Sequence, residues 1–201
     1  MKFNKLAKQI KASRSIIVCT NESGDVWCGT SVDGDVEAMY LGGGLTPRIS
    51  AESLEICLDI PNKDRGGIDK YEFAEDWEFT VYLMDELEGD REVTEKIRTF
   101  EFSGKRFCGF NVCGRFYFVP SALFAPLGEL AQPSFYLRCC GGRFFIAVKD
   151  GFVLAGLVAC YDVGAALIEN WIAEQAQVIA MLNEHIAATA EEEEDGQEML
   201  V

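Results

Sequence analysis

The chain has 201 residues, of which 49% are hydrophobic and 25% charged, and its formal net charge is −15 at pH 7. This length and composition suit one well-filled hydrophobic core with an appendage. The negative charge argues against a general nucleic-acid binder, because phosphate contacts need positive charge.

The sequence also bears on the compartment. No apolar run approaches the roughly 18 to 20 residues that a membrane-spanning helix needs. The basic start of the chain is not followed by the apolar block and cleavage site of a secretory signal. We therefore expect a cytoplasmic protein that makes no membrane contact.

The first forty residues predict a short strand, one amphipathic helix and three strands, between Lys2 and Leu41. Lys5, Lys8 and Lys11 fall within an arc of about 120° on a helical wheel, opposite Leu6 and Ile10. The helix should therefore have an apolar underside and a cationic outer face, with Arg14 just beyond its end. Strands are expected over 15–20, 26–31 and 36–41, joined by turn residues.

The middle of the chain is less regular. Residues 42–44 are three glycines, which favour a flexible linker over a phosphate cradle because no helix start follows them. Ser50 is expected to cap a helix that runs to about Leu58. Further on we expect a polar loop over 64–69, a strand over 77–84, and a hairpin of 97–102 with 105–112.

The first pattern returns after this stretch, between Tyr117 and Val158. A strand over 117–119 leads into a helix that Pro120 opens and that runs to about Leu130. Three strands follow over 135–140, 143–148 and 152–158, with Gly141-Gly142 and Asp150-Gly151 as hairpin turns. Coincidence remains the alternative to a true repeat, since a helix followed by hairpins is common.

The last forty residues predict one long amphipathic helix at 163–190, because apolar residues recur at helical spacing from 165 to 189 without Gly or Pro. We expect this helix to pack on its own domain or to pair subunits into a homo-oligomer. Residues 191–201 form an acidic tail with an apolar tip, either a docking peptide for a protein partner or a solubilising tail. The candidate oligomer-interface residues are Ile168, Trp171, Ile172, Ile179, Leu182 and Ile186.

No catalytic, metal or cofactor site is predicted. The chain lacks the common nucleotide-binding, hydrolase and metalloprotease motifs, and its single histidine is His185. The eight cysteines show no CxxC spacing, which favours reduced, buried thiols, with metal or disulfide roles as the alternative. The acidic run from Asp85 to Asp90 is expected to be a solvated loop.

Arginines alternate with aromatic residues along several expected strands. Such a pattern can hold single-stranded nucleic acid, because rings stack on bases and cations follow phosphates. The alternative is a core sheet with aromatic side chains facing in and arginines facing out. The residues concerned are Arg106, Phe107, 115–118, Arg138 and 143–145.

The doubled order of strand, helix and three strands resembles the repeat of DNA sliding clamps, in which two βαβββ units form one domain. In that family, basic helices line the hole of a ring around DNA, and the sheets form its outside. The resemblance implies an α+β, clamp-like domain over residues 1–162, with an insert at about 43–96. It also implies that Lys5, Lys8, Lys11 and Arg14 contact nucleic acid.

The chain departs from the clamp pattern in three respects. The expected second helix carries Glu129 and no cation, and the long helix at 163–190 has no counterpart in clamps. Only one pair of units is present, so a closed ring would need about six copies. The overall style of the chain also resembles that of small phage and prophage proteins.

These observations give a leading hypothesis and two others. The first is a non-enzymatic, clamp-like accessory or assembly protein that associates with DNA through its basic N-terminal helix. The alternative is a protein-interaction or oligomerisation module with no nucleic-acid role. The third is an enzyme whose site is built from scattered acids and arginines.

Overall fold

The computed structural model describes residues 1–102, 104–162 and 181, without the side chains of a few residues in 97–102 and 161–162. Met1–Asp162 forms one compact unit of α+β structure, mostly strands with few helices. The predicted helix at 163–190, apart from residue 181, and the tail at 191–201 lie outside the described residues. The same holds for the interface residues predicted from Ile168 to Ile186.

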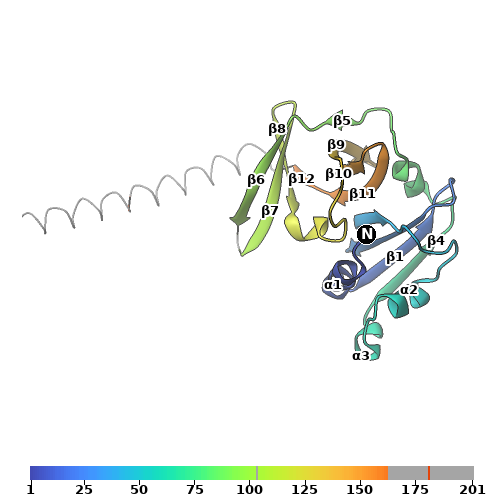
Figure 1. Cartoon of the computed structure of the whole chain (residues 1–201). Helices are drawn as coiled ribbons and strands as arrows, with labels where there is room; N and C mark the ends of the chain where they lie inside the picture. Colours follow the sequence, from blue (N-terminus) through green and yellow to red (C-terminus); the bar gives the residue numbers. More distant parts are fainter. Residues whose placement is uncertain (103, 163–180, 182–201) are drawn as a thin grey trace, which may run out of the picture. The chain divides into compact units, whose positions relative to one another are not determined.

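Eight strands form one large sheet in the order β4-β1-β2-β3-β11-β10-β9-β5 (Figure 1). Every neighbouring pair is antiparallel except β4 with β1, which is parallel. The strands are β1 (Ser15–Thr20), β2 (Val26–Val32), β3 (Asp35–Leu41), β4 (Asp69–Phe73), β5 (Arg91–Glu92), β9 (Pro133–Cys140), β10 (Arg143–Asp150) and β11 (Val153–Ala159).

A second, antiparallel sheet has the order β12-β8-β7-β6. Its strands are β6 (Glu95–Phe102), β7 (Lys105–Val112), β8 (Arg115–Pro120) and β12 (Tyr161–Asp162). The described helices are α1 (Phe3–Ser13), α2 (Ala51–Cys57), α3 (Asn62–Arg65) and the 3₁₀ helices η1 (Glu78–Leu83) and η2 (Ser121–Phe124).

The centre of the large sheet is the antiparallel pair of β3 and β11, in which Met39 lies opposite Leu157. Strands β2 and β1 continue the sheet on one side, and β10 and β9 continue it on the other. The two predicted groups of three strands therefore share one sheet. A Cβ at Gly156 would lie 2.6 Å from Leu127 Cδ2 and 3.3 Å from the Met39 carbonyl oxygen, so a larger residue there would force its neighbours to shift.

Side chains that alternate along each strand build two cores, one on each face of the large sheet. Cys28 and Ile146 point to the face covered by α1, α2, η2 and the second sheet. Trp27 and Phe145 point to the opposite face. A sheet buried on both faces explains why these strands read as nearly continuous apolar runs in the sequence.

The insert supplies both edges of the large sheet and covers its second face. Strand β4 pairs with β1 at one edge, and β5 pairs with β9 at the other. The chain between them, residues 74–90, is called the strap, and its Leu83 is buried in the core around Trp27. The side chain of Arg138, fully buried on β9, forms hydrogen bonds to Asp90 at 2.8 and 2.5 Å and to the carbonyl of Met84 at 2.8 Å.

Several predicted elements are confirmed. The helix of the first pattern is α1, and the strands expected at 15–20, 26–31, 36–41, 135–140, 143–148 and 152–158 are present within a residue or two. Ser50 caps α2, because its Oγ accepts a hydrogen bond from the Ser53 N–H at 3.1 Å. The hairpin of β6 and β7 has the expected bounds to within two residues.

Other predicted elements are wrong. No strand precedes α1, and the Lys2 N–H instead donates to the Pro126 carbonyl at 2.6 Å. The helix expected to run from Pro120 to Leu130 is only the short η2, because Pro126 cannot continue a helix and Gly128 adopts φ 78°. The second unit therefore has no regular α-helix.

The insert holds two further corrections. The strand predicted over 77–84 is the 3₁₀ helix η1, in which Thr80 and Leu83 recur at three-residue spacing and are buried. The Thr80 hydroxyl donates to a backbone carbonyl at the start of this turn, either that of Trp77 at 2.7 Å or that of Glu75 at 2.9 Å. The polar loop expected over 64–69 begins in α3 and ends at the first residue of β4.

Replacement of Arg138 by Met tests the attachment of the strap. We expect Arg138→Met to lower the free energy of unfolding by about 3–5 kcal/mol, because it leaves the Asp90 carboxylate without its partner in a largely buried place. Urea denaturation measures the change. The matched control is Arg143→Met, whose exposed ion pair with Asp35 should contribute at most about 1 kcal/mol. Equal losses in the two variants would contradict the argument.

Candidate nucleic-acid interface

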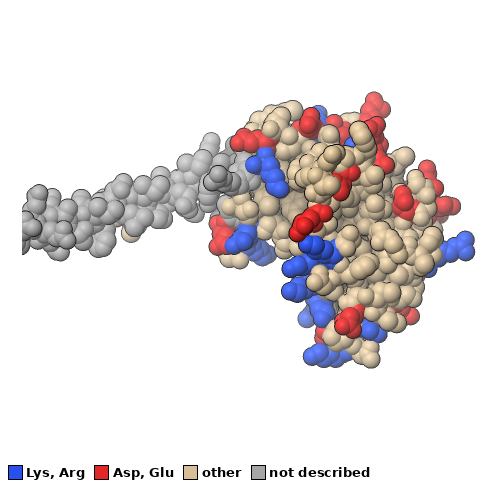
Figure 2. Space-filling model, viewed as in Figure 1, with Lys and Arg blue, Asp and Glu red and all other residues tan. Residues whose placement is uncertain are grey.

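The candidate interface is the outer face of α1. Leu6 and Ile10 are fully buried beneath the helix, and Lys5, Lys8 and Lys11 are exposed on its other side. The apolar face of α1 therefore packs on the sheet, and the opposite face exposes its lysines to solvent. Figure 2 shows the blue side chains of Lys and Arg gathered in a column over α1 and continuing down to α3.

The helix is held in place by polar contacts as well as by its apolar underside. The Gln9 side-chain amide donates to the Ala122 carbonyl at 2.7 Å. The Tyr40 hydroxyl lies 2.8 Å from Gln9 Oε1 and 2.6 Å from the Leu123 carbonyl oxygen. Burial raises the pKa of this hydroxyl, so it stays a neutral donor. These bonds fix α1 against η2 and the centre of the sheet.

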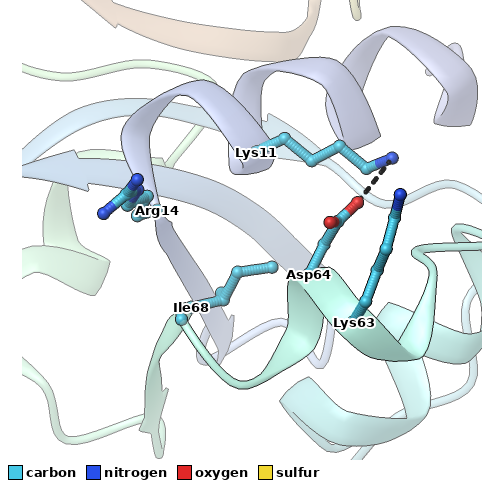
Figure 3. A pocket seen from close by; sticks show the side chains of 6 residues that line it. Lys11, Arg14, Lys63, Asp64 and Ile68 are labelled. Atoms are coloured by element: carbon cyan, nitrogen blue, oxygen red, sulfur yellow. Dashed lines mark ion pairs between the residues drawn. The ribbon is translucent and has the colours of Figure 1, made fainter.

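Arg14 ends the helix in the left-handed conformation, with φ 56°. Beside it lies an open cavity of about 420 Å³, lined by Lys11, Arg14, Lys63, Asp64, Gly67 and Ile68. In Figure 3, Lys11 and Lys63 extend towards Asp64, while Arg14 lies apart from them. Lys11 Nζ is 3.4 Å from Asp64 Oδ2, so one of the predicted cations is partly neutralised.

The structure therefore brings Lys5, Lys8, Lys11 and Arg14 onto one exposed surface. In the described part of the chain, Lys5, Lys8 and Arg14 have no ion-pair partner. Lys63 joins them from α3, and the sequence analysis missed it because nothing in the local pattern shows that α3 lies beside α1. Cations near the end of a helix also favour the helix itself, since its carbonyl end is partly negative.

Three of the four arginines that alternate with aromatic residues pair with carboxylates in the structure. Arg138 and Arg143 each pair with a carboxylate, and Arg106 pairs with Glu101 at 3.1 Å. Tyr117 and Phe145 are buried. The core-sheet interpretation therefore fits better, with the difference that Arg138 faces inward.

Four of the described thiols are buried away from reaction as nucleophiles. Burial raises the pKa of Cys19 and that of Cys140 to about 12, and it also raises the pKa values of Cys28 and Cys108. A thiol with such a raised pKa stays neutral near pH 7, and the thiolate is the nucleophilic form. Within residues 1–102 and 104–162, no group of three or more His, Cys, Asp or Glu is placed to hold a metal ion. His185 lies outside the described residues.

Comparison with protein-family models, curated proteins and solved structures finds no match for this chain. Among the residues whose placement is described, no helix is both long and apolar enough to cross a membrane.

Thiol labelling tests the cysteine environments. With an alkylating reagent at pH 8, we expect the exposed Cys57, Cys113 and Cys139 to react in the folded protein. Cys19 and Cys140 should react only after unfolding, because their raised pKa values keep them neutral. Peptide mass mapping identifies the modified residues. These buried thiols also bind more protons in the folded than in the unfolded state between about pH 9 and 12, so stability should fall as the pH rises through that range.

Rapid alkylation of Cys19 or Cys140 in the native protein would contradict this assignment. An unfolded sample in urea serves as the control, because there all eight cysteines should react.

Proposed function

We propose that this protein is a non-enzymatic, clamp-like accessory or assembly protein that meets DNA through the outer face of α1. The observation that carries the proposal is the exposed row of Lys5 and Lys8 on a helix fixed to the sheet. A row of cations on a fixed helix suits a phosphate backbone, because little backbone order must be gained on binding.

The arrangement of the strands supports the clamp-like part of the proposal. In sliding clamps two similar units form one domain, and here the strands β1-β2-β3 and β9-β10-β11 meet through the pair β3 and β11. Their helical segments, α1 and η2, touch each other through Gln9 and Ala122. The likeness is partial, because η2 is a short 3₁₀ turn and the first unit has no strand before α1.

The proposed mechanism is geometric and electrostatic. Each lysine that contacts a phosphate releases a counterion, so binding should weaken as salt increases. A single basic helix on a protein of net charge −15 gives a weak site. Self-association through the predicted helix at 163–190 would place several such helices on one DNA and raise the avidity.

Anisotropy titrations with a fluorescent DNA duplex at low salt test the DNA contact. We expect Lys5→Glu with Lys8→Glu to weaken binding about 10-fold or more and to lower the slope of log K against log salt by about 2. The matched control is Lys105→Glu with Arg115→Glu, which removes the same charge from exposed sites on the second sheet. Binding that is absent, or equally weakened in both variants, would remove the DNA role.

The alternative function is a protein-interaction or oligomerisation module with no nucleic-acid role. The observation that favours it is the presence of carboxylates beside α1, which offset the positive charge that DNA binding needs. In the cavity next to α1, α3 contributes one cation, Lys63, and also the acidic Asp64. The neighbouring η2 region contributes the exposed Glu129 instead of a cation.

Light scattering tests self-association of the intact chain. We expect Ile172→Glu with Ile179→Glu to reduce the mass to that of one chain, because both residues lie on the predicted apolar stripe. Glu174→Gln with Glu184→Gln changes the predicted polar face and should leave the mass unaltered. A wild-type chain that is already monomeric, or an assembly that persists in the first variant, would remove the predicted role of these residues.

A further inference from the structure

A second cavity lies on the sheet face opposite α1. Its volume is about 570 Å³, within the range of small-ligand sites. We call it the Trp27 cavity. The turn between β1 and β2, the end of β3, the strap and the start of β11 line it, through Asn21, Ser23, Asp25, Trp27, Leu41, Leu83, Met84, Asp85, Glu86, Phe152, Val153 and Leu154.

The charged residues that line this cavity are all acidic. Asp25, Asp85 and Glu86 contribute three carboxylates, and no lysine or arginine is among the described residues that line it. One oxygen of Asp85 accepts the Leu154 N–H at 2.7 Å, which orients that carboxylate. Such a site repels phosphates and acidic peptides, the chain's own tail at 191–195 included, and attracts cations.

Large apolar side chains are exposed to solvent at the Trp27 cavity. Phe152 is 89% exposed in the tight turn before β11, while Met84 is 46% and Val153 49% exposed. A turn residue gains nothing from an aromatic side chain in water, and exposed apolar groups that gather at a cavity mark interaction sites. An apolar group of a ligand would bury these three side chains and displace the water around them, which is favourable.

Trp27, one of the residues that line the cavity, carries an unsatisfied donor. Trp27 is 1% exposed, and its Nε1 has no hydrogen-bond acceptor in the described structure. A buried N–H without a partner is unfavourable, because it has lost water and gained nothing in exchange. Because Trp27 lines the cavity, the signal of this N–H is a suitable probe for binding there.

We propose that the Trp27 cavity binds an extended segment of a partner protein in which a large apolar residue stands next to lysine or arginine. The cationic side chain meets Asp25 and Glu86, and the apolar side chain packs on Phe152 and Met84. The site is independent of the proposed DNA contact, because Trp27 and α1 belong to opposite faces of the large sheet.

Nuclear magnetic resonance of the intact, ¹⁵N-labelled protein tests the proposal, with the indole N–H signal of Trp27 assigned by Trp27→Phe. The probe is the capped peptide Lys-Leu-Arg-Phe-Lys, compared with one in which Glu replaces each basic residue and one in which Ser replaces each apolar residue. We expect only the first peptide to shift the Trp27 signal. A DNA duplex should leave that signal unmoved.

Variants then locate the site. Asp25→Asn with Glu86→Gln should weaken binding of the basic peptide about 10-fold or more, and Phe152→Ser should weaken it several-fold. The control, Asp76→Asn with Glu88→Gln, removes the same charge from exposed strap residues outside the cavity and should have no effect. Circular dichroism confirms that each variant is folded. The proposal is overturned by an unmoved Trp27 signal, by equal binding of the acidic peptide, or by equal loss in the control.

Discussion

The strap depends on one buried contact, that of Arg138 with Asp90. A guanidinium with no exposed surface is tolerated only where every donor finds an acceptor, because an unpaired buried charge is prohibitively costly. Arg138 meets this condition with a two-point contact to Asp90 and hydrogen bonds to the carbonyls of Tyr82 and Met84, at 2.6 and 2.8 Å. Because all these acceptors belong to the strap, the side chain pins the strap to β9 and keeps water from the core around Trp27 and Phe145.

The exposed charges beside the strap differ from those on α1. The acidic residues of the strap, with Asp25, leave carboxylates on the face of Trp27, whereas α1 leaves lysines on the other face. The lysines of α1 are thus separated from the carboxylates of the Trp27 cavity by the thickness of the sheet. Lys5 and Lys8 have no ion-pair partner within the described structure, although the net charge of the chain is −15. Two other lysines of this region do form ion pairs, Lys11 with Asp64 of α3 and Lys2 with Glu129.

The sequence predicts what local patterns control. Helix α1 follows from the spacing of Leu6 and Ile10, and the cap at Ser50 follows from its side chain alone. Structural features that depend on residues far apart in the chain cannot be predicted from local sequence patterns. Arg138 looks like an outward residue of an alternating strand, because its partner Asp90 is 48 positions away. Lys63 is placed beside α1 by tertiary packing, and the Trp27 cavity is assembled from four separate segments.

The two surfaces should respond to salt in different ways, which follows from their composition. Contacts between lysines and phosphates are almost wholly electrostatic, and screening weakens them steeply. Binding in the Trp27 cavity joins carboxylates to the apolar surface of Phe152, Met84 and Val153, and salt does not screen the burial of apolar area. If both proposed contacts exist, added salt should release DNA before it releases the proposed basic segment, because only one of the two contacts depends on charge alone.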